Sequence, residues 1–437
     1  MESGDETMNI RIVNKDKKEL EKVKVLYEEA FPENERIDLE VLKGNEIHAF
    51  YDPEFIGFAS TITYKNITNI SYLAVKEELR DQGYGSQILN AIKEEYLNNT
   101  ITVDIEKLNG HPIREKRKAF YLRNGFKETP LKYTWRNENY NILSTKEINK
   151  EDYIHFWNKI LDERRVIFLD IDGTLVGKSR TLTPKVKEAL IKAREKGHLI
   201  FICSGRNRAG VSKMLEEGCF DGAICSAGAY IEVKDQCIYS DYINEENVYK
   251  AIEVFKKNDV LYNLEATDRT FQSDEISRIF INMHGQDLNS EAQRLKHQQE
   301  EFNVQPLENF NGEPIQTICF MSDKEDKLKE PIEILNPLFH LIVYDKNING
   351  TIINGELMKK GIDKGTGVKK IMDYLDLPYN HSIGFGDSMN DLEMLMTCKY
   401  SVVMQNGDDT IKKYADAICE SVEENGIYYE FKRLGLI

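Results

Sequence analysis

The chain has 437 residues, of which 41% are hydrophobic and 30% charged, and its formal net charge at pH 7 is -16. This length exceeds what one hydrophobic core usually serves, so we expect two or three globular domains. The negative charge opposes nucleic acids and anionic membrane surfaces as main partners, which leaves small molecules.

The cysteines and the N-terminus predict the compartment. The seven cysteines form no C-x-x-C pair, and we interpret them as reduced core thiols. The acidic residues 1–6 lead into no apolar run, so a signal peptide is not predicted. No apolar stretch approaches the roughly 20 residues of a membrane-spanning helix. We therefore expect a soluble cytoplasmic protein.

The first part of the chain mixes strands and helices. Residues 10–13 predict a strand, and 20–30 predict a helix with apolar positions at helical spacing. Residues 48–51 and 56–62, joined by an Asp-Pro turn, predict an antiparallel hairpin. Residues 67–75 predict a further strand.

That strand leads into a glycine-rich loop, Arg80-Asp81-Gln82-Gly83-Tyr84-Gly85-Ser86, and a helix follows. Glycines let backbone N–H groups approach a pyrophosphate, and a helix N-terminus adds partial positive charge. The pattern therefore indicates an anion site, although two glycines also occur in ordinary flexible turns.

Two neighbouring segments strengthen this interpretation. Leu73, Ala74 and Val75 directly precede the loop, and Ala119-Phe120-Tyr121-Leu122-Arg123-Asn124-Gly125-Phe126 follows it. The arrangement of residues 8 to 140 resembles the GNAT acetyltransferase superfamily. The resemblance implies that Leu73, Ala74 and Val75 pair with the pantetheine of acetyl-CoA. It also implies that the glycine loop holds the pyrophosphate.

The same resemblance gives Tyr121 a catalytic role, because the tyrosine at this position protonates the departing thiolate. The alternative is a half-buried aromatic residue on a helix. The general base that accepts the proton of the acceptor amine is not identified. Glu106, which ends the predicted strand 101–105, is one candidate and is otherwise a solvated charge.

Residues 141–164 are expected to connect this domain to the next. Asn149 is a candidate cap for a short helix with Ile154, Trp157, Ile160 and Leu161 on its apolar face. We expect this helix to dock the two domains.

The next segment, Val166-Ile167-Phe168-Leu169-Asp170-Ile171-Asp172-Gly173-Thr174-Leu175, is an apolar run that ends in two aspartates. It predicts a buried parallel strand that delivers carboxylates to a turn at its C-terminal end. Two adjacent carboxylates repel each other and attract a divalent cation such as Mg2+. One aspartate is then a candidate nucleophile. The plain alternative is a strand with an Asp-Gly turn.

Two further strands end in polar residues. Residues 199–203 are followed by Ser204-Gly205-Arg206, which offers a hydroxyl and backbone N–H groups to a phosphoryl oxygen. Residues 382–386 run into Asp387-Ser388-Met389-Asn390-Asp391, an acidic cluster that packing does not demand. A lysine, Lys364, lies between them in sequence.

Residues 245–349 interrupt the alternation of strands and helices. They contain amphipathic stretches at 248–255 and 290–302 and apolar segments at 315–320 and 339–344. We interpret them as an inserted α/β cap domain, after which the alternation resumes at residue 355.

The ordered motifs D-x-D-G-T, S-G, lysine and G-D-S-x-N-D resemble the haloacid-dehalogenase-like (HAD) superfamily, and more closely its Cof-type phosphatases. The match covers about residues 165 to 437. It implies that Asp170 is the nucleophile and Asp172 the acid and base. Mg2+ is then held by the Asp170 and Asp387 carboxylates and the Asp172 carbonyl, with Asp391 binding through water or orienting that shell.

The remaining roles also follow from the resemblance. Ser204, Gly205 and Asn390 would bind the transferring phosphoryl group, and Lys364 would neutralise it. The fold class is α/β, with a GNAT-like mixed-sheet domain at 1–140. A Rossmann-like core at 165–244 and 350–437 then carries the cap at 245–349.

We therefore expect a bifunctional enzyme. Its substrates would be a small phosphorylated metabolite for the Mg2+-dependent phosphatase, and acetyl-CoA with an amine acceptor for the transferase. Two alternatives remain open. In one, the N-terminal domain only senses acyl-CoA and regulates the phosphatase. In the other, the second domain is a phosphomutase.

Overall fold

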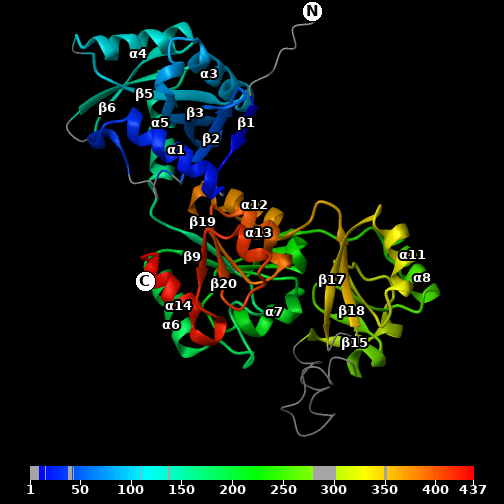
Figure 1. The fold of residues 1–437 in the computed structure, drawn as a ribbon. Coiled ribbons are helices and arrows are strands. Elements are labelled where there is room, and N and C mark those ends of the chain that lie inside the picture. The colour runs from blue at the N-terminus through cyan, green and yellow to red at the C-terminus, as the bar shows by residue number, and fades with distance from the viewer. Residues whose placement is uncertain are drawn as a thin grey trace, which may run out of the picture. The chain divides into compact units, whose positions relative to one another are not determined.

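The computed structural model describes residues 9–14, 16–37, 42, 44–108, 110–135, 138–278, 302–348 and 352–437. Within this part the chain folds as two compact units, Met1–Glu163 and Arg164–Ile437 (Figure 1). None of the described helices has both the length and the apolar character to cross a membrane. The amphipathic stretch predicted at 290–302 lies, except for its last residue, outside the described residues.

The first unit is built on a seven-stranded sheet with the order β1-β2-β3-β4-β5-β7-β6. Neighbouring strands are antiparallel except for β4 and β5, which are parallel. The predicted hairpin and the strand at 67–75 are confirmed. The strands are β1 (Asn9–Ile12), β2 (Glu46–Tyr51), β3 (Phe55–Tyr64), β4 (Ile67–Val75), β5 (Thr100–Glu106), β6 (Lys127–Trp135) and β7 (Glu138–Ser144).

Among the residues that the structure describes, four helices supply apolar side chains that cover this sheet, and each contributes to one of three hydrophobic clusters. Helix α1 begins after Asp16, whose carboxylate accepts hydrogen bonds from the N–H groups of Lys18 and Glu19 and so satisfies the first turn. The helices are α1 (Lys17–Ala30), α3 (Tyr84–Glu95), α4 (Pro112–Arg123) and α5 (Lys150–Ile160).

The expected boundary at residue 140 falls inside strand β7, and the expected connector belongs to the first unit. Helix α5 starts at the predicted cap, where the Asn149 side chain accepts a hydrogen bond from Asp152 N. Its Tyr153 and Phe156 pack in a cluster with Ile62 and Ile142 of the sheet. Burial of this apolar face therefore extends the first unit to Glu163.

The second unit contains an eight-stranded core sheet with the order β12-β11-β10-β9-β8-β19-β20-β21. Strands β10, β9, β8, β19, β20 and β21 are parallel, and the hairpin β11–β12 closes one edge. The strands are β8 (Val166–Leu169), β9 (Leu199–Cys203), β10 (Gly222–Cys225), β11 (Tyr230–Val233), β12 (Gln236–Ser240), β19 (Ser382–Gly386), β20 (Tyr400–Met404) and β21 (Ala417–Cys419).

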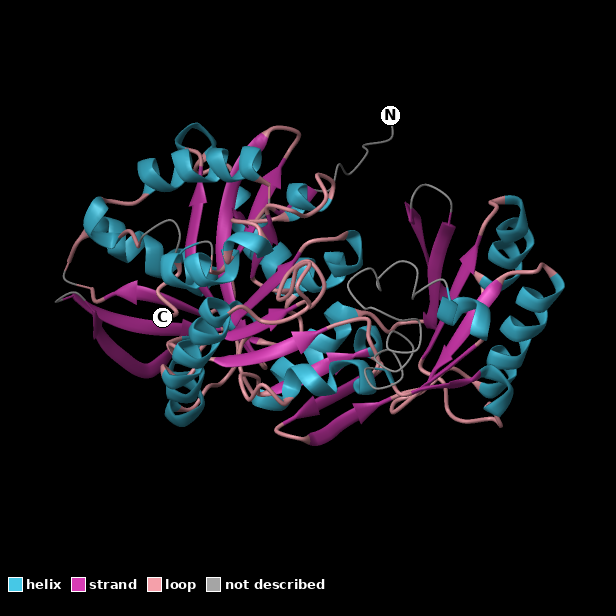
Figure 2. Cartoon of the chain, turned by 90° about the horizontal axis from the view of Figure 1, so that it is seen from below, coloured by secondary structure: helices cyan, strands magenta, loops and turns pink. Residues whose placement is uncertain are grey.

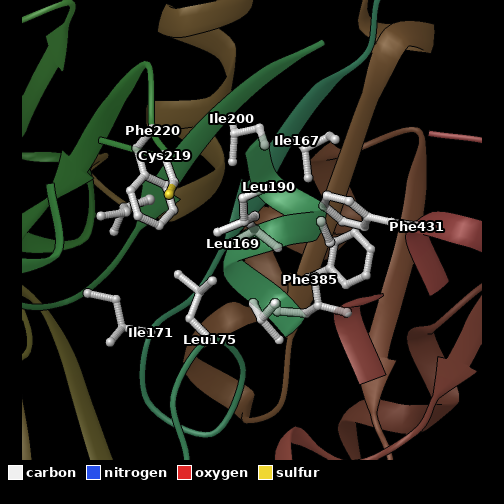
Figure 3. Close-up of a cluster of buried hydrophobic side chains, with 14 of the residues drawn as sticks. Ile167, Leu169, Ile171, Leu175, Leu190, Ile200, Cys219, Phe220, Phe385 and Phe431 are labelled. Atoms are coloured by element: carbon white, nitrogen blue, oxygen red, sulfur yellow. The ribbon is translucent and has the colours of Figure 1, made fainter. Parts of the chain in front are cut away.

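Helices cover both faces of this sheet, as the continuous apolar runs of its central strands require. Figure 3 shows Ile167 and Leu169 of β8 among side chains of α6 and α14. The ring centroids of Phe385 and Phe431 lie 5.6 Å apart. The helices of the core are α6 (Pro184–Glu195), α7 (Arg208–Leu215), α12 (Lys364–Leu375), α13 (Leu392–Thr397) and α14 (Gly426–Arg433).

The cap is a six-stranded sheet with the order β15-β14-β13-β16-β18-β17 and two helices on one face (Figures 1 and 2). Its amphipathic stretch at 248–255 is confirmed as part of a helix. The elements are α8 (Glu245–Lys257), β13 (Leu261–Glu265), β14 (Thr270–Gln272), β15 (Val304–Pro306), β16 (Thr317–Ser322), α11 (Asp326–Leu335), β17 (Phe339–Ile348) and β18 (Ile352–Lys359).

The cap ends later than the sequence predicted. We expected the core to resume by residue 350, with Gly355 to Leu357 in it. These residues instead lie in β18, which pairs antiparallel with both β16 and β17 of the cap. An apolar strand carries no local sign of which sheet it joins, and the core is entered again only at α12.

Candidate active site

Three neighbouring strands of the core sheet deliver polar residues to one edge. Asp170 follows β8, Ser204 follows β9 and Asp387 follows β19. Because β9 and β19 both pair in parallel with β8, their C-terminal ends meet at the same edge. This is the edge at which open α/β sheets bind ligands. The predicted convergence of the three motifs is therefore present in the fold.

Three carboxylates gather around one lysine at this edge. Asp170, Asp387 and Asp391 each offer an oxygen, and these oxygens lie within 4.8 Å of one another. Lys364 Nζ donates to Asp170 Oδ1 at 2.7 Å and to Asp391 Oδ1 at 2.6 Å. The Asp172 carboxylate is not part of this group and lies largely exposed.

The pKa values show that the three carboxylates repel one another. Burial and the neighbouring Asp391 raise the pKa of Asp170 well above its usual range, and Lys364 only partly offsets this. Burial and Asp391 likewise raise the pKa of Asp387 to about 7. One lysine does not balance three buried carboxylates, so the set has the charge and the oxygen donors that a hard divalent cation prefers.

A glycine allows the loop after β8, which carries Asp172, to lie against the loop after β19, which carries Asp387. Gly173 has a φ of +89°, and a Cβ there would lie 2.2 Å from Asp387 Oδ2. Glycine is therefore the residue that fits between Asp172 and the Asp387 carboxylate. Thr174 then donates its hydroxyl to Asp387 Oδ1 at 3.2 Å. Asp391 Oδ2 accepts from the N–H groups of Asp387 and Ser388, which fixes this loop.

Arg206 is a site residue to which the sequence analysis gave no role. Its Nε and Nη2 donate to the two Asp172 oxygens at 2.9 and 2.7 Å. Its backbone N–H bonds Ser204 Oγ at 3.2 Å. Its position directly after Ser204-Gly205 could have marked Arg206 as a candidate site residue. Its contact with Asp172, however, could be found only from the fold.

A small, partly open pocket lies beside this cluster. From the core it is lined by Gly205, Lys364 and Asn390, and from the cap by residues that include His340 and Glu356. Asn390 Oδ1 accepts a hydrogen bond from Ser388 Oγ at 2.7 Å, which orients the amide. Three of the four predicted phosphate-binding residues, Gly205, Lys364 and Asn390, therefore share one pocket with residues of the cap.

In the first unit, the glycine loop forms the start of helix α3. Gly83 caps the helix at a φ of +92° and has no side chain to bond the first-turn N–H groups. A Cβ at Gly85 would lie 3.2 Å from the Phe120 ring, so this glycine permits α3 and α4 to pack closely. Arg80 Nε donates to Val75 O at 3.2 Å and ties the loop to β4.

Strands β4 and β5 separate next to this loop. Their pairing ends at Ile70 and Val103, and a bulge in β4 follows at once. Leu73, Ala74 and Val75 continue the pairing with β3 alone. Their other edge is therefore the position at which an extended ligand could add to the sheet.

The two candidate catalytic residues of the first unit, Tyr121 and Glu106, lie in different environments. Tyr121 is buried against Phe120 and Phe126, and burial raises its pKa to about 12. Glu106 is also buried and forms an ion pair with Arg117, so it is not a solvated charge. Its carboxylate is already engaged by a guanidinium, which argues against a role as base.

The sequence analysis did not name Asp104, two residues earlier on β5, because no sequence motif around it marks it as a site residue. It accepts hydrogen bonds from Tyr153 at 2.9 Å and from Asn69 at 3.2 Å. Burial raises its pKa to about 6 despite these donors. Its charge also contributes, less than burial does, to the raised pKa of Tyr121.

Two known family models match the chain, one in each unit. Residues 167–431 match the model of the haloacid dehalogenase-like hydrolases, and residues 43–128 match the acetyltransferase (GNAT) domain. These matches confirm both resemblances drawn from the sequence.

Individual relatives extend the comparison for the second unit. The phosphatase YwpJ of Bacillus subtilis is 23% identical over 62% of this chain and 99% of its own length. The 5-amino-6-(5-phospho-D-ribitylamino)uracil phosphatase YwtE of the same organism is 26% identical over 62% of this chain and 98% of its own. The solved structure of BT1666 from Bacteroides thetaiotaomicron shares the fold, with 23% identity and a TM-score of 0.52 over 63% of this chain and 96% of its own.

Proposed function

Because the chain belongs to the haloacid dehalogenase-like hydrolases, we propose that its second unit hydrolyses phosphate monoesters of small metabolites through a phosphorylated Asp170. The observation that carries this proposal is the buried cluster of Asp170, Asp387 and Asp391 around Lys364, beside a pocket shared with the cap.

The carboxylates fit Mg2+, because they are oxygen donors whose mutual repulsion a divalent cation relieves. Asp170 and Asp387 would hold the ion directly. Asp391 has Lys364 on one oxygen and two backbone N–H groups on the other, so its role is to fix the loop. When bound, Mg2+ would neutralise phosphoryl charge and align the ester for attack.

The nucleophile is oriented by the protein itself. Lys364 bonds Asp170 Oδ1, which leaves Oδ2 to attack phosphorus. As the new P–O bond forms, the bond to the leaving alcohol breaks, and that oxygen takes a proton from Asp172. Asp172 then takes a proton from water, whose oxygen attacks phosphorus and releases phosphate from Asp170.

Arg206 would control when Asp172 exchanges protons. Both oxygens of Asp172 accept hydrogen bonds from this guanidinium, so Arg206 must release Asp172 before that carboxyl can reach the leaving group. Asp172 is largely exposed, and exposed ion pairs contribute only about 0.2–1 kcal/mol. An entering phosphoryl group can therefore compete with Asp172 for Arg206, while Gly210 O still accepts a hydrogen bond from the guanidinium.

The test is phosphate release from a panel of phosphorylated metabolites, with Mg2+ or with EDTA, by the full chain and by Asp170→Asn. The panel includes the compound after which YwtE is named. Release that needs both Mg2+ and Asp170 supports the proposal. Equal release by the variant contradicts covalent catalysis, and transfer of phosphate between sugar positions without release indicates the phosphomutase.

For the first unit we propose acetyl transfer from acetyl-CoA to an amine, with Tyr121 as the acid and Asp104 as the base. The separated edge of β4 and the uncapped start of α3 support binding of the cofactor's pantetheine and pyrophosphate. A carboxylate with a pKa of about 6 is ionised at neutral pH and can accept a proton as the amine attacks.

Two measurements separate transfer from sensing. Calorimetric titration with acetyl-CoA reports binding, and a thiol-release assay over a panel of amines reports turnover. Binding together with thiol release supports the transferase. Binding without release, accompanied by a changed phosphatase rate, shows that the domain acts as a sensor.

A further inference from the structure

The start of helix α7 connects the core to the cap. Asn207 directly precedes this helix, follows Arg206 in the chain and is only 1% exposed. Its side-chain Oδ1 accepts a hydrogen bond from Gly210 N at 3.0 Å and so caps the first turn. Capping uses only this oxygen, so the amide nitrogen of the same side chain is available for bonds outside the helix.

The amide nitrogen of Asn207 bonds the cap. It donates to Ala266 O and Thr270 Oγ1, both at 3.1 Å, and to Arg269 O at 3.2 Å. Thr270 begins β14, and the other two acceptors lie in the turn between β13 and β14. A buried amide that lost these acceptors would be left unsatisfied at a cost in stability, so the bonds hold this turn of the cap against the core.

Two more contacts join the same elements. Ala209 N, in the first turn of α7, donates to Thr267 O of the cap turn at 3.2 Å. Phe302 of the cap packs against Arg206, whose Cζ lies 5.4 Å from the ring centroid. A Cβ at Gly210 would lie 2.9 Å from Phe302 Cδ1, so glycine at this position makes room for the ring. The cap therefore contacts both the helix start and the arginine before it.

These contacts surround the arginine that holds the candidate acid and base. Arg206 binds both oxygens of Asp172, and its Nη1 donates to Gly210 O at 3.2 Å. Its carbonyl oxygen accepts a hydrogen bond from Ser226 N at 2.8 Å. Because Asn207 is the next residue in the chain, its bonds to the cap also fix the backbone from which the Arg206 side chain extends.

We propose that Asn207 is a positioning residue that couples the cap to Arg206, and through Arg206 to Asp172. While the cap is bonded to Asn207, the guanidinium stays where it can bind the entering phosphoryl group and release Asp172. Without these bonds Arg206 is not held in place for this exchange, and Asp172 protonates the leaving oxygen more slowly. This inference rests on the proposed phosphatase function and adds a residue from outside the carboxylate cluster.

Two variants remove the bonds to the cap and keep the helix cap. Asn207→Asp retains an oxygen for Gly210 N but has no N–H group to donate. Asn207→Ser adds no charge, and serine also caps helices well but is too short to reach the cap turn. Asn149→Asp is the matched control, because Asn149 caps α5 in the first unit by accepting from Asp152 N at 2.7 Å. Thermal unfolding of each variant reports whether it is folded.

The readout is the dependence of the rate on the leaving group. Expulsion of an alkyl alcohol needs a proton from the acid, whereas p-nitrophenolate leaves without one. Because kcat/KM covers the steps up to phosphate transfer to Asp170, it reports this protonation. The full chain with Mg2+ is assayed on p-nitrophenyl phosphate and on the alkyl phosphate of the metabolite panel that it hydrolyses fastest.

We expect both Asn207 variants to lower kcat/KM at least about tenfold for the alkyl phosphate and less than about threefold for p-nitrophenyl phosphate. Asn149→Asp should change neither value. In a double-mutant cycle, Asn207→Ser should add less than about twofold to the effect of Arg206→Ala, because it acts through that arginine.

Several results overturn the inference alone. They are an unchanged kcat/KM in the Asn207 variants, equal losses on both substrates, and independent effects of Asn207→Ser and Arg206→Ala. Failure of both Asn207 variants to fold, while Asn149→Asp folds, assigns Asn207 a purely structural role and overturns it as well. Absence of Asp170-dependent release from every alkyl phosphate refutes the proposed function and the inference with it.

Discussion

Replacing Glu265 by glutamine should make the cap more stable. The pKa of this carboxyl rises from 4.5 to about 8 in the folded chain, mainly through burial. At about 1.4 kcal/mol for each pKa unit, ionisation above pH 8 then costs at most about 5 kcal/mol of folding free energy. The side chain keeps some contact with solvent, which lowers this ceiling, so we expect a gain of about 2–3 kcal/mol from Glu265→Gln.

The gain should depend on pH with a definite sign. Because the folded pKa is raised, the folded chain holds the Glu265 proton more tightly than the unfolded chain does. The cost of ionisation is therefore complete above pH 8 and shrinks as the pH falls toward 4.5. Glu265→Gln should stabilise the protein most at pH 9 and by less than about 1 kcal/mol at pH 5.

Urea unfolding at pH 9 and pH 5 measures this difference. Both tryptophans, Trp135 and Trp157, lie in the first unit, so their fluorescence is an internal control. Far-UV circular dichroism reports both units, so a transition that it shows and the tryptophan fluorescence does not belongs to the second unit. Glu333→Gln controls for loss of charge on the cap. An equal or lower stability of Glu265→Gln at pH 9 would show that the carboxyl is not held in a poorly solvated site.

Three further results are expected. Asp170→Asn should lower phosphate release at least about 1,000-fold, measured with p-nitrophenyl phosphate, because it removes the nucleophile. Lys364→Met should lower the unfolding free energy by about 3 kcal/mol in EDTA, since buried carboxylates lose their cation, and Mg2+ should restore part of it in urea titrations. Asp104→Asn should slow acetyl transfer about 100-fold and abolish a rise in rate with pH through about 6. Glu106→Gln should change this rate less than tenfold. If Glu106→Gln instead slows acetyl transfer more than Asp104→Asn does, Glu106 is the base.

The sequence determined the architecture of the phosphatase core because its signals are local. Asp170, Ser204 and Asp387 each follow a short apolar strand, and parallel strands bring their C-terminal ends to one edge. The residues of the carboxylate cluster could thus be named before the fold was known. The glycine loop after β4 could also be recognised from the sequence, because Gly83 adopts a backbone conformation that favours glycine.

Other features depended on pairings that no local pattern encodes. The segment around Gly355 reads as a core strand, but cross-strand hydrogen bonds place it in the cap. The sequence predicts that Glu106 is a solvated charge at the end of a strand. In the structure, Arg117 of α4 forms an ion pair with it. The contact between Arg206 and Asp172 likewise joins residues that end different strands.

The polar face of the cap sheet shows the same limit. Glu265, Thr317 and Glu356 lie on three strands far apart in the sequence, and only the register of the cap sheet puts them on one face. Sequence periodicity tells which side chains share a face of one strand. It does not tell which strands become neighbours, because that choice depends on packing across the whole sheet. The sequence by itself therefore identified the two families and the residues of the carboxylate cluster, and the tertiary structure decided which side chains surround them.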